Sequence, residues 1–146
     1  MKTLAIFSAF LAAIALVVIA AEPPAAATYV DHDKVAETFA KGGALAKGDD
    51  FTASVLRRTA AGQVEVHEKE TDIFYITAGE ATFVTGGKIV GGKMSKPGQL
   101  LGTDIEGGVS HHLTKGDIIT IPAGVPHWFK EVQSPIYYYM VKVLRP

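Results

Sequence analysis

Hydrophobic positions divide the chain into three parts. Residues 1–21 form an almost unbroken apolar run, in which 18 residues are hydrophobic. Asp31–Lys41 then shows the spacing of three to four residues that is typical of an amphipathic helix. From about residue 50 onward, short segments of β-branched and aromatic residues alternate with turns that contain glycine. The pattern predicts an apolar leader, one short helix and a succession of short strands.

One helix is predicted over Asp31–Lys41. Asp31 or Asp33 can cap its amino end, and Gly42-Gly43 can close its carboxyl end. The helix has a single apolar face, which is suited to packing against the outside of a sheet. That face consists of Val35, Ala36, Phe39 and Ala40.

Eight strands are predicted after residue 48, separated by turns that include Gly79-Glu80 and Ser134-Pro135. Many short strands without intervening helices indicate a sandwich or a small barrel. Residues 86–110 hold eight glycines, so we expect an elongated hairpin or a mobile flap over a cavity mouth. The predicted strands are Phe51–Arg58, Val64–His67, Asp72–Thr77, Ala81–Thr85, Ser110–Leu113, Asp117–Ile121, His127–Val132 and Ile136–Val143.

The apolar leader has the build of a secretory signal peptide. Lys2 gives a positive start, Leu4–Ala20 is apolar, and Val18 and Ala20 are spaced like the residues before a cleavage site. The sequence therefore predicts a signal peptide over 1–21, a linker over 22–30 and a single domain over 31–146, exported to the periplasm or secreted. An uncleaved membrane anchor is the alternative, because the run almost reaches the length that spans a bilayer.

Composition narrows the functional classes. Without residues 1–21, about 42 % of the remaining 125 residues are apolar, and 13 basic residues stand against 15 acidic ones. This near balance gives no support for nucleic acid or an anionic membrane as a partner. The sequence has no cysteine, which excludes disulfides, thiolate nucleophiles and iron–sulfur clusters. It has no asparagine either, which excludes N-linked glycosylation.

The first stretch with candidate chemistry begins at Glu65. Side chains two residues apart in a strand share one face, so Glu65 and His67 are expected to point the same way. A turn through Glu68–Thr71 then returns the chain at Asp72, at the start of the next strand. Asp72 is thus a candidate ligand beside Glu65 and His67, with capping of the turn as its alternative role.

The second stretch runs through a Pro-Gly turn into His127. We expect His127, Phe129 and Glu131 to share one strand face. Glu131 is then either an acid or base in a cavity or an exposed strand end. His111 and His112 are adjacent on a strand, so one of them faces inward, as a lining residue, a further ligand or a proton shuttle.

These residue types favour a metal site of nitrogen and oxygen ligands. Two imidazoles with one or two carboxylates suit Fe(II), Mn(II), Zn(II) or Ni(II), and without thiolates a soft metal is not expected. If only three of the four candidates bind the ion, positions remain open for water or substrate. A metal at such a site can polarise an oxygen ligand or activate water.

The two stretches resemble the two conserved motifs of the cupin superfamily. The first family motif reads His-x-His, three or four residues, Glu, six residues, Gly, and here its last three positions are filled by His67, Asp72 and Gly79. The second family motif is matched at every spacing by Gly116, Pro122, Gly124 and His127. Together the motifs and their surroundings cover roughly residues 50–143.

The sequence also departs from that pattern. Glu65 stands at the first histidine, Asp72 at the usual glutamate, Glu131 at the asparagine, and Thr59 at a glycine. The resemblance implies an all-β double-stranded β-helix, or jelly-roll barrel, with the short helix packed outside. It further implies one divalent metal, most simply Mn, Fe or Zn, inside the barrel, and the positions that correspond to the family's ligands are Glu65, His67, Asp72 and His127.

The resemblance implies an exported metal-binding cupin that acts on a small organic molecule, favouring an enzyme of oxygenase, lyase or isomerase type. Glu65, as ligand or base, and Glu131 are the candidate catalytic residues, with His111 or His112 assisting proton transfer. A non-catalytic module that binds a sugar, metabolite or metal is the alternative, and a structural domain with a vestigial site is the third. We expect a small-molecule ligand, no nucleic acid, no membrane after cleavage of the leader and, by analogy, a homodimer.

Three further expectations concern single side chains. Trp128 faces away from His127 and is expected to pack under the helix or against a partner subunit. Tyr138 is expected on the strand face opposite to its two tyrosine neighbours. Arg57 and Arg58 place one charge on each face of their strand, where the inward one can bind an anionic substrate or form a surface ion pair.

Overall fold

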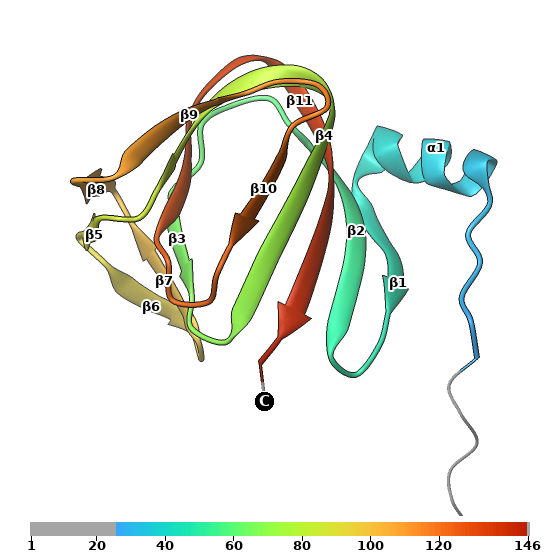
Figure 1. Ribbon diagram of the computed structural model, residues 1–146, viewed down its shortest axis with the longest axis horizontal. Helices are drawn as coiled ribbons and strands as arrows, with labels where there is room; N and C mark the ends of the chain where they lie inside the picture. The colour runs from blue at the N-terminus through green and yellow to red at the C-terminus, as the bar shows by residue number, and fades with distance from the viewer. Residues whose placement is uncertain (1–25, 146) are drawn as a thin grey trace, which may run out of the picture.

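The computed structural model describes residues 26–145, so the predicted signal peptide lies outside the described residues (Figure 1). This part of the chain contains one helix and eleven strands. They are α1 (His32–Lys41), β1 (Gly43–Lys47), β2 (Phe51–Arg58), β3 (Val64–His67), β4 (Glu70–Thr85), β5 (Lys88–Val90), β6 (Lys93–Lys96), β7 (Gln99–Gly102), β8 (Asp104–Glu106), β9 (Val109–Leu113), β10 (Ile118–Ile121) and β11 (His127–Leu144).

The strands form a curled jelly roll around one core. One sheet runs in the order β1-β2-β11-β3-β7-β6, and β4 joins it through β11 while also pairing with β9 and β10. Figure 1 shows these strands wrapped around a common interior, with α1 outside them. The all-β jelly roll with a short N-terminal helix is therefore confirmed, although the pairing does not close into a complete barrel.

The two longest strands, β4 and β11, pair over most of their lengths. Turns were expected at Gly79-Glu80 and Ser134-Pro135, and this prediction is wrong, because both strands continue through these points. Gly79 has a φ of 76°, and a Cβ there would meet the carbonyl of Pro135. The register between the strands shifts nearby, so glycine and bulges bend the strands without ending them.

An aromatic cluster fills the core. The ring centroids of Phe83 and Phe129 lie 4.6 Å apart in an edge-to-face arrangement, and those of Phe74 and Tyr138 lie 5.0 Å apart. All four side chains are buried. This confirms that Tyr138 lies on the strand face opposite to its two tyrosine neighbours, and it places the three phenylalanines in the core.

Helix α1 packs on the outer face of the sheet. The side chain of Asp31 accepts a hydrogen bond of 2.9 Å from the backbone N–H of Lys34, which confirms the predicted cap. The Phe39 ring lies against the outward-facing tyrosines, 5.1 Å from Tyr139 and 6.4 Å from Tyr137 between centroids. The indole N–H of Trp128 donates to the Gly62 carbonyl at 2.7 Å, away from the Phe39 contacts of the helix, and packing of Trp128 against a partner subunit stays a prediction.

The glycine-rich segment 86–110 forms an elongated hairpin. Strand β5 pairs with β8 at the base of the hairpin, β6 pairs with β7 nearer its tip, and the tip lies at Pro97-Gly98. Strand β7 also pairs with β3 along its full length. The hairpin alternative is thus the one that the fold contains, and it forms a wall next to β3.

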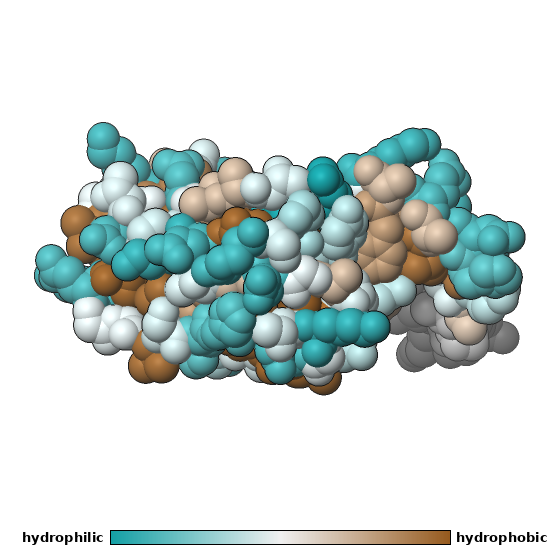
Figure 2. All heavy atoms as spheres, turned by 90° about the horizontal axis from the view of Figure 1, so that it is seen from above, coloured by the Kyte–Doolittle hydropathy of each residue, from teal (hydrophilic) through white to brown (hydrophobic). Residues whose placement is uncertain are grey.

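No helix in residues 26–145 is long and apolar enough to cross a membrane. The face seen in Figure 2 is mainly hydrophilic, with hydrophobic side chains in small separate groups. The most exposed large hydrophobic side chains of the strands are spread over β6, β9 and β10. Scattered apolar side chains of this kind do not define an interface, so the homodimer stays a prediction.

Candidate metal centre

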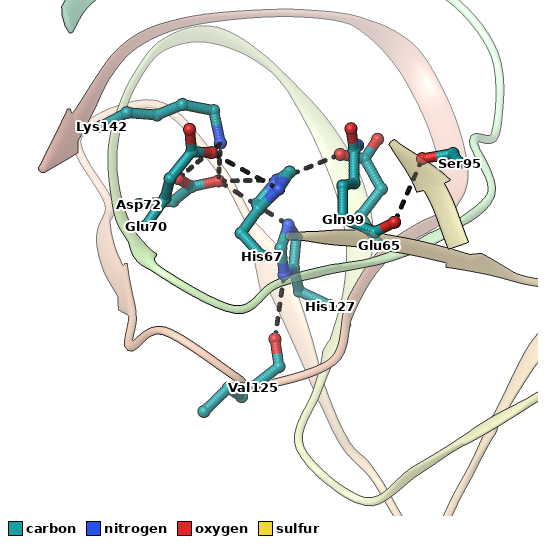
Figure 3. Close-up of polar contacts among 9 residues, drawn as sticks. All are labelled: Glu65, His67, Glu70, Asp72, Ser95, Gln99, Val125, His127 and Lys142. Atoms are coloured by element: carbon teal, nitrogen blue, oxygen red, sulfur yellow. Dashed lines mark hydrogen bonds and ion pairs between the residues drawn. The ribbon is translucent and has the colours of Figure 1, made fainter. Parts of the chain in front are cut away.

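Four predicted site residues lie together in the jelly roll (Figure 3). Glu65 and His67 share a face of β3, Asp72 lies near the start of β4, and His127 begins β11. Residue His127 pairs with Glu65 in register, which brings the start of β11 beside β3. The first and second motifs therefore meet through strand pairing, although Glu65 and His127 are more than fifty residues apart in the sequence.

The polar atoms of these side chains converge. Nε2 of His67 lies 3.3 Å from Oε2 of Glu65 and 3.6 Å from Oδ2 of Asp72. Nε2 of His127 lies 3.7 Å from the same Asp72 oxygen. His67, Asp72 and His127 are buried, with 6 %, 2 % and 5 % of their surface exposed, whereas Glu65 is half-buried. Buried polar atoms at this spacing need a shared partner or a network.

The orientation of His127 suits a metal ligand. Its Nδ1 lies 3.1 Å from the Val125 carbonyl, which can only accept a hydrogen bond, so Nδ1 carries the proton and donates. Nε2 is then left with a free lone pair that faces the cluster. A backbone or carboxylate acceptor behind the ring is the usual support of a metal-binding histidine.

Glu70 and Lys142 complete the surroundings of the cluster. Nζ of Lys142 donates to both oxygens of Asp72, at 2.7 and 3.0 Å, and lies 3.1 Å from Glu70. Glu70 is also 3.5 Å from Nδ1 of His67. Sequence reasoning missed both residues. Glu70 was placed in a turn although it shares a strand face with Asp72, and Lys142 is paired with Asp72 only through the β4–β11 register.

Two overlapping groups have ligand atoms close enough for one ion. One is Glu65, His67 and His127, and the other is His67, Glu70 and Asp72, with all ligand atoms of a group within 4.8 Å of one another. The first group supplies two imidazole nitrogens and a carboxylate, and it leaves the Lys142–Asp72 pair intact. The donor set of the first group therefore fits a divalent ion of the Mn, Fe or Zn type.

The pKa shifts favour the protonation states that a metal requires. The hydrogen bond with His67 lowers the pKa of Glu65, outweighing the opposing effect of burial. Burial lowers the pKa of His127, outweighing the backbone contact with Val125 and the nearby Asp72 carboxylate. At neutral pH, Glu65 is thus a carboxylate and His127 a neutral imidazole, which are the forms that bind metal ions.

Three other predicted residues lie away from the cluster. Glu131 is exposed and lies 3.4 Å from the Gln133 amide, so the exposed position is the one of its two expected roles that the structure contains, and it does not share the inward face of His127. The reason is the register shift between Phe129 and Glu131. This bulge interrupts the alternation of inward and outward side chains along β11, so Glu131 no longer shares the face of Phe129. His111 contacts the Thr85 hydroxyl at 2.8 Å, and His112 is exposed and pairs with Glu80.

A cavity of about 170 Å³ adjoins the cluster. Glu65, His67, Asp72, His127 and Lys142 line one part of it. The remaining wall is mainly aromatic and apolar, with one further cation, and its residues include Arg58, Phe74, Phe129, Tyr138 and Met140. The site thus combines a polar metal-binding end with room for a molecule of a few heavy atoms.

Comparison with known proteins agrees with this geometry. The family described as Cupin matches residues 44–142, whereas no curated protein matches the chain. Among solved structures, 181 chains match. BH2720 from Bacillus halodurans has a TM-score of 0.57 at 14 % identity, and the match covers 81 % of this chain and 82 % of that one.

Two further structures show the same fold. KdgF from Halomonas sp. has a TM-score of 0.51 at 17 % identity, and the match covers 72 % of this chain and 78 % of that one. The cupin domain of Cnp3 from Schizosaccharomyces pombe has a TM-score of 0.51 at 14 % identity, covering 70 % of this chain and 59 % of that one. At such identities the likeness concerns the fold alone.

Proposed function

The chain belongs to the cupin family, and on that premise we propose that it is a metal-dependent enzyme acting on a small organic molecule. The proposed ligands of one divalent ion are Glu65, His67 and His127. The observation that carries the proposal is the convergence of two buried imidazole nitrogens and a carboxylate oxygen at the edge of a cavity. Mn, Fe and Zn are the proposed ions, because the donors are nitrogen and oxygen only.

A bound ion would supply Lewis-acid or redox chemistry at this end of the cavity. The protein's own residues have separate tasks. Val125 fixes the His127 ring, and Lys142 holds the Asp72 carboxylate beside the two imidazoles. Glu65 is the most exposed of the three proposed ligands and lines the cavity, so a base that takes a proton from a molecule there is its alternative role to that of a ligand. Phe74 and Phe129 form an apolar part of the cavity wall.

We also propose that the protein is exported, because the leader has the build of a signal peptide. An exported protein without cysteine depends on its core, without disulfides, for stability. Cleavage is tested by mass spectrometry of the mature protein from a periplasmic or secreted fraction. A mature chain that begins near residue 22 supports export, and a full-length chain in the membrane fraction supports the anchor.

Titration with Co(II) tests the proposed ligands. Chelator-treated protein is titrated, and the visible absorption of the bound ion gives the stoichiometry. We expect one equivalent for wild type, at least a tenfold loss of affinity for His67→Ala and His127→Ala, and no change for His112→Ala, which alters an exposed histidine outside the cluster. Equal Co(II) affinities of His127→Ala and His112→Ala would contradict the assignment of His127 as a metal ligand.

Catalysis is tested separately from metal binding. Metal-loaded wild type and His127→Ala are assayed in parallel with a panel of small metabolites, with product analysis and dioxygen uptake as readouts. Turnover that depends on His127 supports an enzyme, and dioxygen uptake distinguishes an oxygenase from a lyase or isomerase. Metal binding and ligand binding without turnover would favour the non-catalytic binding module instead.

A further inference from the structure

Two cations line the cavity beside the proposed metal centre, and they differ in their partners. Lys142 contacts the carboxylates of Asp72 and Glu70. Arg58, at the end of β2, forms no ion pair within 4.0 Å among residues 26–145. Its Nε is buried and has no hydrogen-bond partner in this part of the chain. Arg58 is thus a cavity-lining cation that no carboxylate of the described residues contacts.

The guanidinium of Arg58 is held in place without an acidic partner. Its central carbon lies 4.8 Å from the centroid of the Phe129 ring. Stacking on an aromatic face leaves the in-plane N–H donors of a guanidinium available. On its other side lies Gly62, where a Cβ would meet Nη1 of Arg58. Gly62 is itself fixed, because its N–H donates to Phe129 and its carbonyl accepts from Trp128.

Tyr138 adds a hydroxyl to the same part of the cavity. Burial raises the pKa of this phenol, and the Arg58 guanidinium offsets part of the rise. The hydroxyl therefore stays protonated at neutral pH and can donate a hydrogen bond. Arg58 and Tyr138 together form a donor group at the aromatic wall of the cavity.

We propose that Arg58, with Tyr138 beside it, binds the carboxylate of a small organic acid whose carbon chain enters the cavity. A carboxylate matches the planar fork of a guanidinium and forms two charge-assisted hydrogen bonds with it. The volume of about 170 Å³ has room for a short chain, and Phe74 and Met140 offer apolar surface to that chain. The bound acid is a substrate only if the protein is the enzyme proposed above, so this inference rests on the proposed function. Binding of the carboxylate by Arg58 itself requires no metal.

Butyrate and its neutral amide, butyramide, provide a matched pair of probes. Both are titrated by calorimetry into chelator-treated protein, so that an ion cannot bind the carboxylate. We expect butyrate to bind at least tenfold more tightly than butyramide. Arg58→Gln should remove this preference, and Arg58→Lys should retain part of it. Arg57→Gln is the control, because Arg57 is exposed on the opposite face and contacts Tyr137.

Several results would overturn the inference. It is wrong if wild type binds neither probe, if butyrate and butyramide bind equally, or if Arg57→Gln weakens butyrate as much as Arg58→Gln does. It is also wrong if inorganic phosphate binds more tightly than butyrate. Circular dichroism and Co(II) stoichiometry of Arg58→Gln verify that the variant folds. Butyrate binding that depends on Arg58 in a protein that holds no metal would leave this inference standing while the proposed function fails.

Discussion

At the scale of residues, Lys142 determines how Asp72 can be buried. A carboxylate with 2 % exposure is costly unless a cation or several donors accompany it. Lys142 provides this compensation with two short contacts and neutralises the charge of Asp72. Without a metal, the Lys142–Asp72 pair stabilises the fold. Asp72 can act as a metal ligand only if its carboxylate gives up a hydrogen bond from Lys142.

Lys142→Met should destabilise the chelator-treated protein, because it leaves the Asp72 carboxylate buried without its cation. We expect the free energy of unfolding to fall by about 3 kcal/mol, at the lower end of the range for breaking a buried pair, since Lys142 is partly exposed. Urea denaturation measures the change. Lys88→Met, at an exposed position in β5, should change it by less than about 0.5 kcal/mol. Equal effects of the two substitutions would refute this role.

The burial of His127 predicts a pH dependence. Because burial lowers its pKa in the folded protein, the unfolded chain binds more protons at this residue below pH 6.5. The free energy of unfolding of chelator-treated wild type should therefore fall as the pH drops from 7.5 to 5.5. His127→Gln should show a smaller fall over the same range in urea denaturation. Parallel pH profiles for the two proteins would contradict this explanation.

The strand faces of Glu65, His67 and His127 and the place of Asp72 after a turn could be predicted from local alternation. That these residues meet at one site was implied by the resemblance to the two cupin motifs, because the contact of His127 with β3 is long-range. The position of Glu131 could not be predicted. Alternation from His127 places it inward, but the bulge after Phe129 moves it to the surface, and nothing local in the sequence marks that bulge. Lys142 was missed for a related reason, because its contact with Asp72 joins residues 70 positions apart.

At the scale of elements, the length of β4 and β11 explains how two distant motifs form one site. Their pairing runs from His127–Thr85 at one end to Leu144–Glu70 at the other. The strand types were predictable from β-branched and aromatic residues. Their continuity was not, because Gly79 and Pro135 are ordinary turn residues and only the close contact between the two strands explains both. Strand β1 was missed because Gly43–Lys47 has few residues that favour strands.

Helix α1 places the Phe39 ring against two tyrosines of the sheet, which makes its docking testable. Phe39→Ala removes the edge-to-face contacts with Tyr137 and Tyr139. We expect hydrogen exchange in α1 to become at least tenfold faster, while the amides of β4 and β11 and the Co(II) stoichiometry stay unchanged. His32→Ala, which alters a fully exposed side chain of the same helix, is the control. Loss of protection in the central strands would contradict this independence.

At the scale of the whole molecule, the aromatic core adjoins the metal-binding group. The ring centroids of Phe83 and His127 lie 6.1 Å apart, and core aromatic side chains line the cavity beside the proposed ligands. An ion that binds only the folded state adds RT ln(1 + [L]/Kd) to stability, about 2.7 kcal/mol at one hundred times Kd. Chelation should therefore lower the melting temperature of wild type, and re-addition of the ion should restore it.

The melting temperature of His127→Ala should not respond to the same treatment. This variant keeps the aromatic cluster but loses one of the three proposed ligands. Differential scanning fluorimetry with and without chelator measures both proteins side by side. An equal response of wild type and His127→Ala would show that the ion stabilises the protein at some other place.

Elemental analysis of the purified wild-type protein tests the metal centre most directly. The sample is measured as purified and again after reconstitution with Mn(II), Fe(II) or Zn(II) followed by removal of free ions. Two buried imidazole nitrogens and a carboxylate at the edge of one cavity predict about one divalent ion per chain. A protein that retains no divalent ion in either state would contradict the account.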